Sequence, residues 1–158
     1  MSVRRWLGAA TSAAILAASA VALSPTPAIA GEKLVLPPIT ITLKADGTDP
    51  GTQAEIYCVL QPLGVTRVGP DAVAGATANC NALVYSITIG VWLYREGAFA
   101  AADGSEKTWT VSNNAAAYAQ CTDGYYYAYV AATFRAPWAI PPSVFVDNWS
   151  PIYTITGC

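Results

Sequence analysis

Acidic side chains are the groups in this sequence best suited to acid–base chemistry, because the chain contains no histidine. Without histidine, Ser-His-Asp and Cys-His catalysis and most catalytic zinc sites are excluded. The sequence also lacks a G-x-S-x-G motif, a P-loop and a dinucleotide-binding motif. Glycoside hydrolysis is still compatible with this composition, since it needs only two carboxylates about 5–10 Å apart in a cleft.

The acidic residues, however, fall mostly where a structural role is expected. An aspartate in a glycine-containing turn is favoured because its side chain bonds to the local backbone. Glu55 lies between strand positions and Glu96 follows Arg95, so both are expected to face solvent. A calcium loop from Asp46 to Asp49 would be too short for the ligand set of that ion. We predict no catalytic residue, no metal and no cofactor. The aspartates expected in turns are Asp46, Asp49, Asp103 and Asp123.

Aromatic residues at regular spacing point instead to a binding surface. In the stretch Cys121 to Arg135, tyrosines recur at every second position, which places them on one face of a strand. A second alternating stretch, Leu83 to Arg95, carries aromatic residues on its less apolar face. If the two strands are neighbours, the rings form a platform suited to sugars, peptides or a protein partner; otherwise they simply cover a sheet beneath long loops. The candidate binding surface is Trp92, Tyr94, Tyr125, Tyr127 and Tyr129.

Two further tryptophans, Trp138 and Trp149, lie in proline-rich segments that are expected to be loops. Either ring could be an exposed anchor for a partner. The segment Pro137–Pro142 could also be a rigid loop of the kind that an inhibitor of extracellular hydrolases presents. Asn148 begins an Asn-x-Ser glycosylation sequon, which matters only in a host that uses it.

The first thirty residues predict a helical signal peptide. Arg4 and Arg5 form its positive end, an uncharged alanine-rich segment follows, and Ala28-Ile29-Ala30 is a cleavage site. We expect residues 1–30 to be removed, residues 31–158 to form a single secreted domain, and no stable membrane anchor to remain. Without the leader, 6 basic residues stand against 10 acidic ones, a net charge of −4. Such a surface is not expected to bind nucleic acid.

An even number of cysteines in an exported chain predicts disulfides. Spacing alone leaves three pairings open. Cys121 precedes one predicted strand and Cys158 ends the last one, so antiparallel pairing of these strands would bring them together. Cys58–Cys80 would then close the segment between two other strands. The alternative is an immunoglobulin-like bridge packed on Trp92, but the Tyr-x-Cys pattern of that fold is missing at Cys121.

Short alternating segments separated by Gly, Pro, Asn and Asp predict an all-β fold. We expect a two-sheet antiparallel β-sandwich of immunoglobulin-like type, with a small β-barrel as the alternative. Residues 61–79 are expected to be a long irregular connection that could hold a short strand at residues 65–68. Turns are expected at Asp103-Gly104, and a break at Asn113-Asn114. The stretch Leu83 to Arg95 is expected to bury one continuous face, formed by Leu83, Tyr85, Ile87, Ile89, Val91 and Leu93.

Several features together resemble small exported proteins of actinobacteria whose function is uncharacterised. These features are the arginine-led leader, the run Val91-Trp-Leu-Tyr-Arg-Glu-Gly97, the Cys-x2-Gly-Tyr stretch from Cys121 to Tyr125, the proline-rich segment and the terminal cysteine. The resemblance covers most of the mature chain and implies a secreted, disulfide-bonded β domain. It carries over no site residue.

These observations predict a secreted, non-enzymatic β protein that binds a protein or glycan partner or decorates the cell surface. One alternative is an inhibitor of extracellular hydrolases, and another is a small carboxylate-dependent glycan-active enzyme. A flat exposed aromatic face would favour binding, a protruding and well-anchored proline-rich loop would favour inhibition, and two acidic residues in one concave site would favour catalysis.

Overall fold

The computed structural model describes residues 36–45 and 55–158, so the expected signal peptide, Asp46 and Asp49 lie outside the described residues. The described residues contain no helix, and hence none long and apolar enough to cross a membrane. The predicted all-β class is confirmed. The strands are β1 (Ile39–Ala45), β2 (Glu55–Val68), β3 (Asp71–Arg95), β4 (Ala98–Gln120), β5 (Gly124–Arg135), β6 (Ala139–Ile140), β7 (Ser143–Trp149) and β8 (Tyr153–Ile155).

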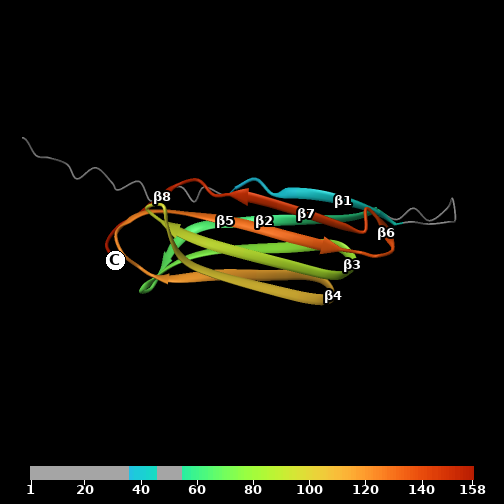
Figure 1. The fold of residues 1–158 in the computed structure, drawn as a ribbon, viewed down its shortest axis with the longest axis horizontal. Coiled ribbons are helices and arrows are strands. Elements are labelled where there is room, and N and C mark those ends of the chain that lie inside the picture. Colours follow the sequence, from blue (N-terminus) through green and yellow to red (C-terminus); the bar gives the residue numbers. More distant parts are fainter. Residues whose placement is uncertain (1–35, 46–54) are drawn as a thin grey trace, which may run out of the picture. The chain divides into compact units, whose positions relative to one another are not determined.

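All eight strands belong to one antiparallel sheet that nearly closes into a barrel (Figure 1). The long strand β3 is its centre. One edge of β3 pairs with β4 along most of its length, while the other edge pairs first with β2 and then with β5. The chain returns toward closure after β5, because β6 pairs with β1 and β7 pairs with β5. These pairings do not establish the separate sheets of an immunoglobulin-like sandwich.

The β2–β3–β4 region is more regular than the sequence suggested. Residues 61–79, expected to be irregular, form the end of β2 and the start of β3, with a tight turn at Gly69-Pro70. Asp103 lies within β4, opposite Val91, rather than in a turn. Both predictions are wrong apart from the short strand at residues 65–68, because a sheet admits glycine and proline at bulges and edges.

The inward–outward alternation of β3 shifts by one residue between Ser86 and Ile87, which are both buried. Before this point the even-numbered positions of β3 face the core, and after it the odd-numbered positions do. The prediction of one buried face is therefore wrong at its start: Leu83 is 49% exposed and Tyr85 is also exposed, whereas Val84 is buried. From Ile87 onward the predicted inward positions are buried.

The core is lined by the inward side chains of β2, β3 and β5. Tyr126 and Phe134 are its largest members, and burial of such a side chain contributes about 1.5–3 kcal/mol. The Tyr126 hydroxyl donates to the Thr122 carbonyl at 2.8 Å and accepts from the Thr122 N–H at 3.1 Å. A buried phenol is therefore fully bonded to the turn that precedes its own strand.

Asn113 was expected to break a strand, but it lies inside β4 and is buried. Its amide donates to the carbonyls of Ile87 at 2.8 Å and Ser105 at 2.9 Å, and its side-chain oxygen accepts from the Ser105 hydroxyl at 2.9 Å. A buried amide with these partners carries no desolvation penalty for an unmade bond. Asn113 therefore ties β4 to β3 and to an earlier part of β4 itself.

Two disulfides join elements that the topology places side by side, and they have the pairing favoured from the strand order. Cys58 and Cys80 are register partners in β2 and β3, with Cα atoms 4.0 Å apart. Cys121 and Cys158 have Cα atoms 5.4 Å apart, because β8 pairs antiparallel with the start of β5. Each bridge contributes about 3–4 kcal/mol by restricting the unfolded chain.

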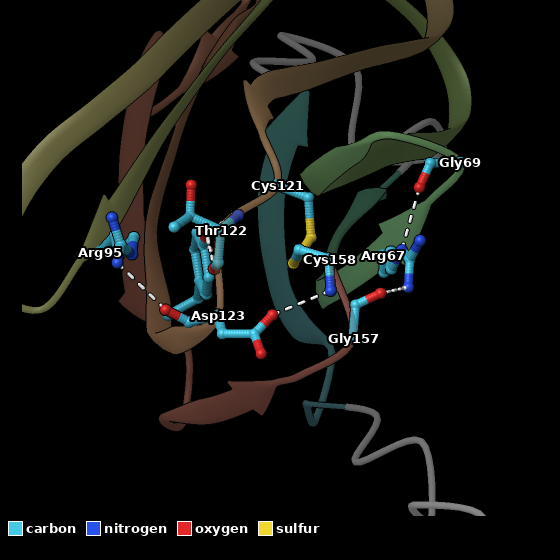
Figure 2. Close-up of a disulfide and its surroundings, with 9 residues drawn as sticks. Arg67, Gly69, Arg95, Cys121, Thr122, Asp123, Gly157 and Cys158 are labelled. Carbon is cyan, nitrogen blue, oxygen red and sulfur yellow. Dashed lines mark hydrogen bonds between the residues drawn. A yellow bond between two sulfur atoms is a disulfide. The ribbon is translucent and has the colours of Figure 1, made fainter.

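Polar contacts fix the C-terminus around the second disulfide (Figure 2). The Asp123 carboxylate accepts from the Cys158 N–H at 2.8 Å, and the Arg67 guanidinium donates to the Gly157 carbonyl. Arg95 donates to the Asp123 carbonyl at 3.0 Å. Asp123 therefore has a structural role at the entry to β5, as its predicted position in a turn suggested.

Candidate functional site

Strand pairing brings the predicted aromatic residues together on the outer side of the sheet. Trp92 is the register partner of Tyr129, and Tyr94 is the partner of Tyr127. Tyr129 is in turn opposite Trp149 of β7. Side chains directly opposite in an antiparallel pair lie close enough to touch. The predicted aromatic platform required β3 and β5 to be neighbours, and they are.

The rings contact one another as a continuous cluster, which we call the aromatic face. Tyr94 stacks on Tyr127 with centroids 5.3 Å apart and an angle of 7° between planes. Tyr129 contacts Trp92 at 5.3 Å and Trp149 at 4.8 Å. Rings that pack on one another lose little further freedom when a ligand binds, so the surface is preorganised. The aromatic face comprises Trp92, Tyr94, Phe99, Tyr127, Tyr129 and Trp149.

Two members of the aromatic face were missed or misplaced by sequence reasoning. Trp149 was expected in a loop but is the last residue of β7, and it is 53% exposed. Phe99, which is 61% exposed, was not selected. The tight turn at Glu96-Gly97 places Phe99 opposite Tyr94. Pairing the residues on either side of this turn as a hairpin could have identified Phe99 from the sequence.

Tyr125 extends the same side of β5 without a ring contact of the kind that links the other tyrosines. It is exposed and lines a hollow of about 400 Å³ with Tyr127 and Ile152. The five predicted surface residues therefore lie on one side of the sheet, with Tyr125 at its margin.

A hydrogen bond fixes the orientation of Tyr129. Its hydroxyl donates to the Asp147 carboxylate at 2.7 Å. This bond raises the pKa of Tyr129 above its ordinary value, with smaller contributions from burial and from the negative charge of Asp147. The phenol therefore stays protonated at neutral pH and holds the carboxylate beside Trp149.

A groove of about 700 Å³ opens beside Trp92. Its floor is made of small residues, because Gly90 is opposite Gly104 on one side and Ala131 on the other. A Cβ atom on Gly90 would lie 2.3 Å from Cη2 of Trp92, so the indole bends over this glycine. The volume falls within the range of about 300–1,000 Å³ typical of small-ligand sites. The absence of a Cβ at Gly90 therefore makes room for the Trp92 indole.

The groove offers hydroxyl and carboxylate groups to a ligand. Thr88 and Thr133 are register partners in its wall, and Glu106 lies opposite Thr88 on β4. Asp103 and Ser105 also line the groove. Among the described residues that line the groove, none is lysine or arginine. This polar set accepts hydrogen bonds and repels anions.

The two carboxylates of the groove were not predicted as a pair. Asp103 was assigned to a turn, and Glu106 was not considered. Both residues line the groove, but the register of β4 on β3 pairs Asp103 with buried Val91, and Glu106 with Thr88 of the groove wall. Their side chains therefore leave opposite faces of β4, and Glu106 is the carboxylate on the side of Thr88. Both side chains are exposed. Within the described ranges, no cluster of three or more potential metal ligands is present.

The proline-rich segment is fastened to the sheet. Ala139 and Ile140 pair with β1, and the Ala136 N–H donates to the Pro142 carbonyl at 2.9 Å. Trp138 stacks on Trp109 of β4, with centroids 5.7 Å apart and an angle of 13° between planes. This pair forms a second exposed aromatic feature, beyond the far end of the groove.

Comparison of the chain with protein-family models, curated proteins and solved structures finds no match. The resemblance to exported actinobacterial proteins therefore stays a prediction. Function has to be argued from the aromatic face and the groove.

Proposed function

We propose that this chain is an exported, non-enzymatic glycan-binding protein whose binding site is the aromatic face and the adjoining groove. Export is supported by the predicted leader and by two disulfides, which persist in oxidising compartments. No stable membrane anchor is expected after the leader is removed.

One observation carries the proposal: preorganised aromatic rings border a groove that is rich in hydrogen-bond acceptors. A sugar ring has apolar C–H faces that pack on aromatic side chains and hydroxyls that donate to carboxylates. Glu106, opposite Thr88 in the groove wall, is placed to accept such bonds, while Trp92 and Trp149 provide apolar area. Nucleic acid and other polyanions are disfavoured by the same carboxylate.

Affinity measurement with protein purified from the medium tests this proposal. The probes are linear β-1,4-linked oligomers of glucose and of N-acetylglucosamine. Trp149→Ala should weaken binding about tenfold, because a central aromatic contact is lost. Tyr118→Ala is the matched control, since Tyr118 is an exposed aromatic residue on β4 that pairs with Val73, away from the aromatic face. Equal affinity of the two variants, or binding of neither sugar series by the unmodified protein, would contradict the proposal.

Catalysis on a glycan is the second candidate, because Asp103 and Glu106 line one groove. A general acid is normally shielded from water so that it keeps its proton near neutral pH. Both carboxylates are exposed, which favours binding over turnover. New reducing ends that disappear in both Asp103→Asn and Glu106→Gln would establish an enzyme. Intact sugars after prolonged incubation would exclude hydrolysis of these probes.

An inhibitor of extracellular hydrolases is supported less well. The segment is well anchored, because Ala139 and Ile140 pair with β1. However, β6 is an edge strand of only two residues, so it offers a protease little backbone for strand-like bonds.

A further inference from the structure

We infer that the binding site is extended, and that its ligand is an internal segment of a linear neutral glycan running along β3 and β5. The glycan would contact the aromatic face at one end, the groove in the middle and the Trp109–Trp138 pair at the other end. This inference rests on the proposed function and adds the shape of the ligand, its direction and a second anchor.

The outer residues of β5 show the length of the site. Tyr127, Tyr129, Ala131, Thr133 and Arg135 follow one another on this side of the strand. At about 3.3 Å per residue, Tyr127 and Arg135 are about 26 Å apart along the strand. That distance is several times the length of one sugar ring. Small residues in the middle leave the path open between larger residues at its ends.

The far end of the path is occupied by aromatic residues again. The Arg135 guanidinium lies over the ring of Tyr85, 5.8 Å from its centroid. Tyr85 contacts Trp109 edge to face at 5.6 Å, and Trp109 stacks on Trp138. Residues of β3, β4, β5 and the proline-rich segment therefore converge at one point. Arg135 lies beyond the described residues that line the groove, so its charge is at this end of the path.

Trp109 is held in an unusual backbone conformation. Its φ is 48°, a region that bulky side chains seldom adopt. The neighbouring Thr110 hydroxyl donates to the Ser112 carbonyl at 2.8 Å and accepts from the Ser112 N–H at 3.1 Å, which fixes the local chain. The indole is nevertheless 60% exposed. Strain that presents an apolar ring to solvent is typical of a contact site and is not explained by core packing.

The charges along this path select a neutral chain. A polyanion would have to pass Glu106, while a hydroxyl of a neutral glycan can donate to this carboxylate. A cationic peptide is the competing occupant, since carboxylates and aromatic rings also attract cations. The hydroxyls of Thr88 and Thr133, which are register partners in the groove wall, favour contacts with sugar hydroxyls.

Calorimetric titration with a length series tests the inference. Protein purified from the medium is titrated with each β-1,4-linked series from disaccharide to hexasaccharide. Affinity should rise with length until the chain spans the groove. Trp138→Ala should lower hexasaccharide affinity about tenfold and leave disaccharide affinity unchanged, since only the longer chain reaches this ring.

A second variant distinguishes the loss of the Trp109 ring from a loss of folding. Trp109→Gly removes the indole and also suits the positive φ, so folding should be maintained while hexasaccharide affinity falls. Trp149→Ala should weaken short and long oligomers alike. Affinity independent of length, or unaffected by both far-end variants, would overturn the extended site and leave the proposed function standing. Binding of oligolysine in place of both sugar series would overturn both.

Discussion

The two sides of β5 carry similar residues and have different roles. Tyr126 and Tyr127 are neighbours in sequence, but Tyr126 is buried and bonded to Thr122, whereas Tyr127 stacks on Tyr94 at the surface. Further along, Phe134 fills the core and Thr133 lines the groove. Under the proposed function, the alternation of a single strand separates stability from recognition. Inner substitutions should unfold the protein, and outer ones should impair binding in a folded protein.

The largest effect is expected on the inner side. Phe134→Ala should lower the free energy of unfolding by about 3–5 kcal/mol, because it leaves a cavity at a side chain that is 0% exposed. Denaturant unfolding measures this loss. Thr133→Ala is the control from the opposite side of β5 and should change stability little. Comparable losses of unfolding free energy in the two variants would contradict the difference expected between the two sides of β5.

Removal of a disulfide should also reduce stability while leaving the aromatic face intact. Cys58→Ala combined with Cys80→Ala should cost about 3 kcal/mol, since the bridge closes a segment of 22 residues. At a temperature where this variant remains folded, its affinity for the sugar probes should match that of the unmodified protein. A loss of affinity in the folded variant would show that the bridge also shapes the binding surface.

Filling the groove should impair binding more than stability. Gly90→Ala would push its Cβ against Trp92, costing about 1–3 kcal/mol of stability and displacing the indole from the groove. Affinity for the disaccharide should fall about tenfold. Gly104→Ala is the matched variant, because its Cβ would approach only the Ile89 carbonyl, at 3.4 Å. If both alanine variants bind as the unmodified protein does, Trp92 is not part of the site.

The smallest expected effect concerns pH. Because the pKa of Tyr129 is raised in the folded protein, its hydrogen bond to Asp147 contributes stability below the ordinary tyrosine pKa, about 10. That contribution is lost as pH rises through the higher folded value. Asp147→Asn removes the charged acceptor and should lower the pKa of Tyr129, as followed by NMR titration of the ring. An unchanged titration would mean that the bond is absent in solution.

The sequence predicted the all-β class because alternation of apolar residues is a local property. The inward set of β5 and the aromatic row opposite it followed from the same alternation. The positions of Phe99 beside Tyr94 and of Glu106 beside Thr88 depend on strand register, which only the folded chain defines. The exposure of Leu83 depends on a shift of the alternation at Ser86-Ile87, where both residues look like ordinary strand residues.

The most direct test of the glycan-binding site follows the indole N–H signals of the mature chain by NMR, one each for Trp92, Trp109, Trp138 and Trp149. Titration with a disaccharide that binds should shift the signals of Trp92 and Trp149, with Trp109 and Trp138 responding only to the hexasaccharide. If none of the four signals moves at saturating sugar, the outer side of β5 is not a glycan-binding surface.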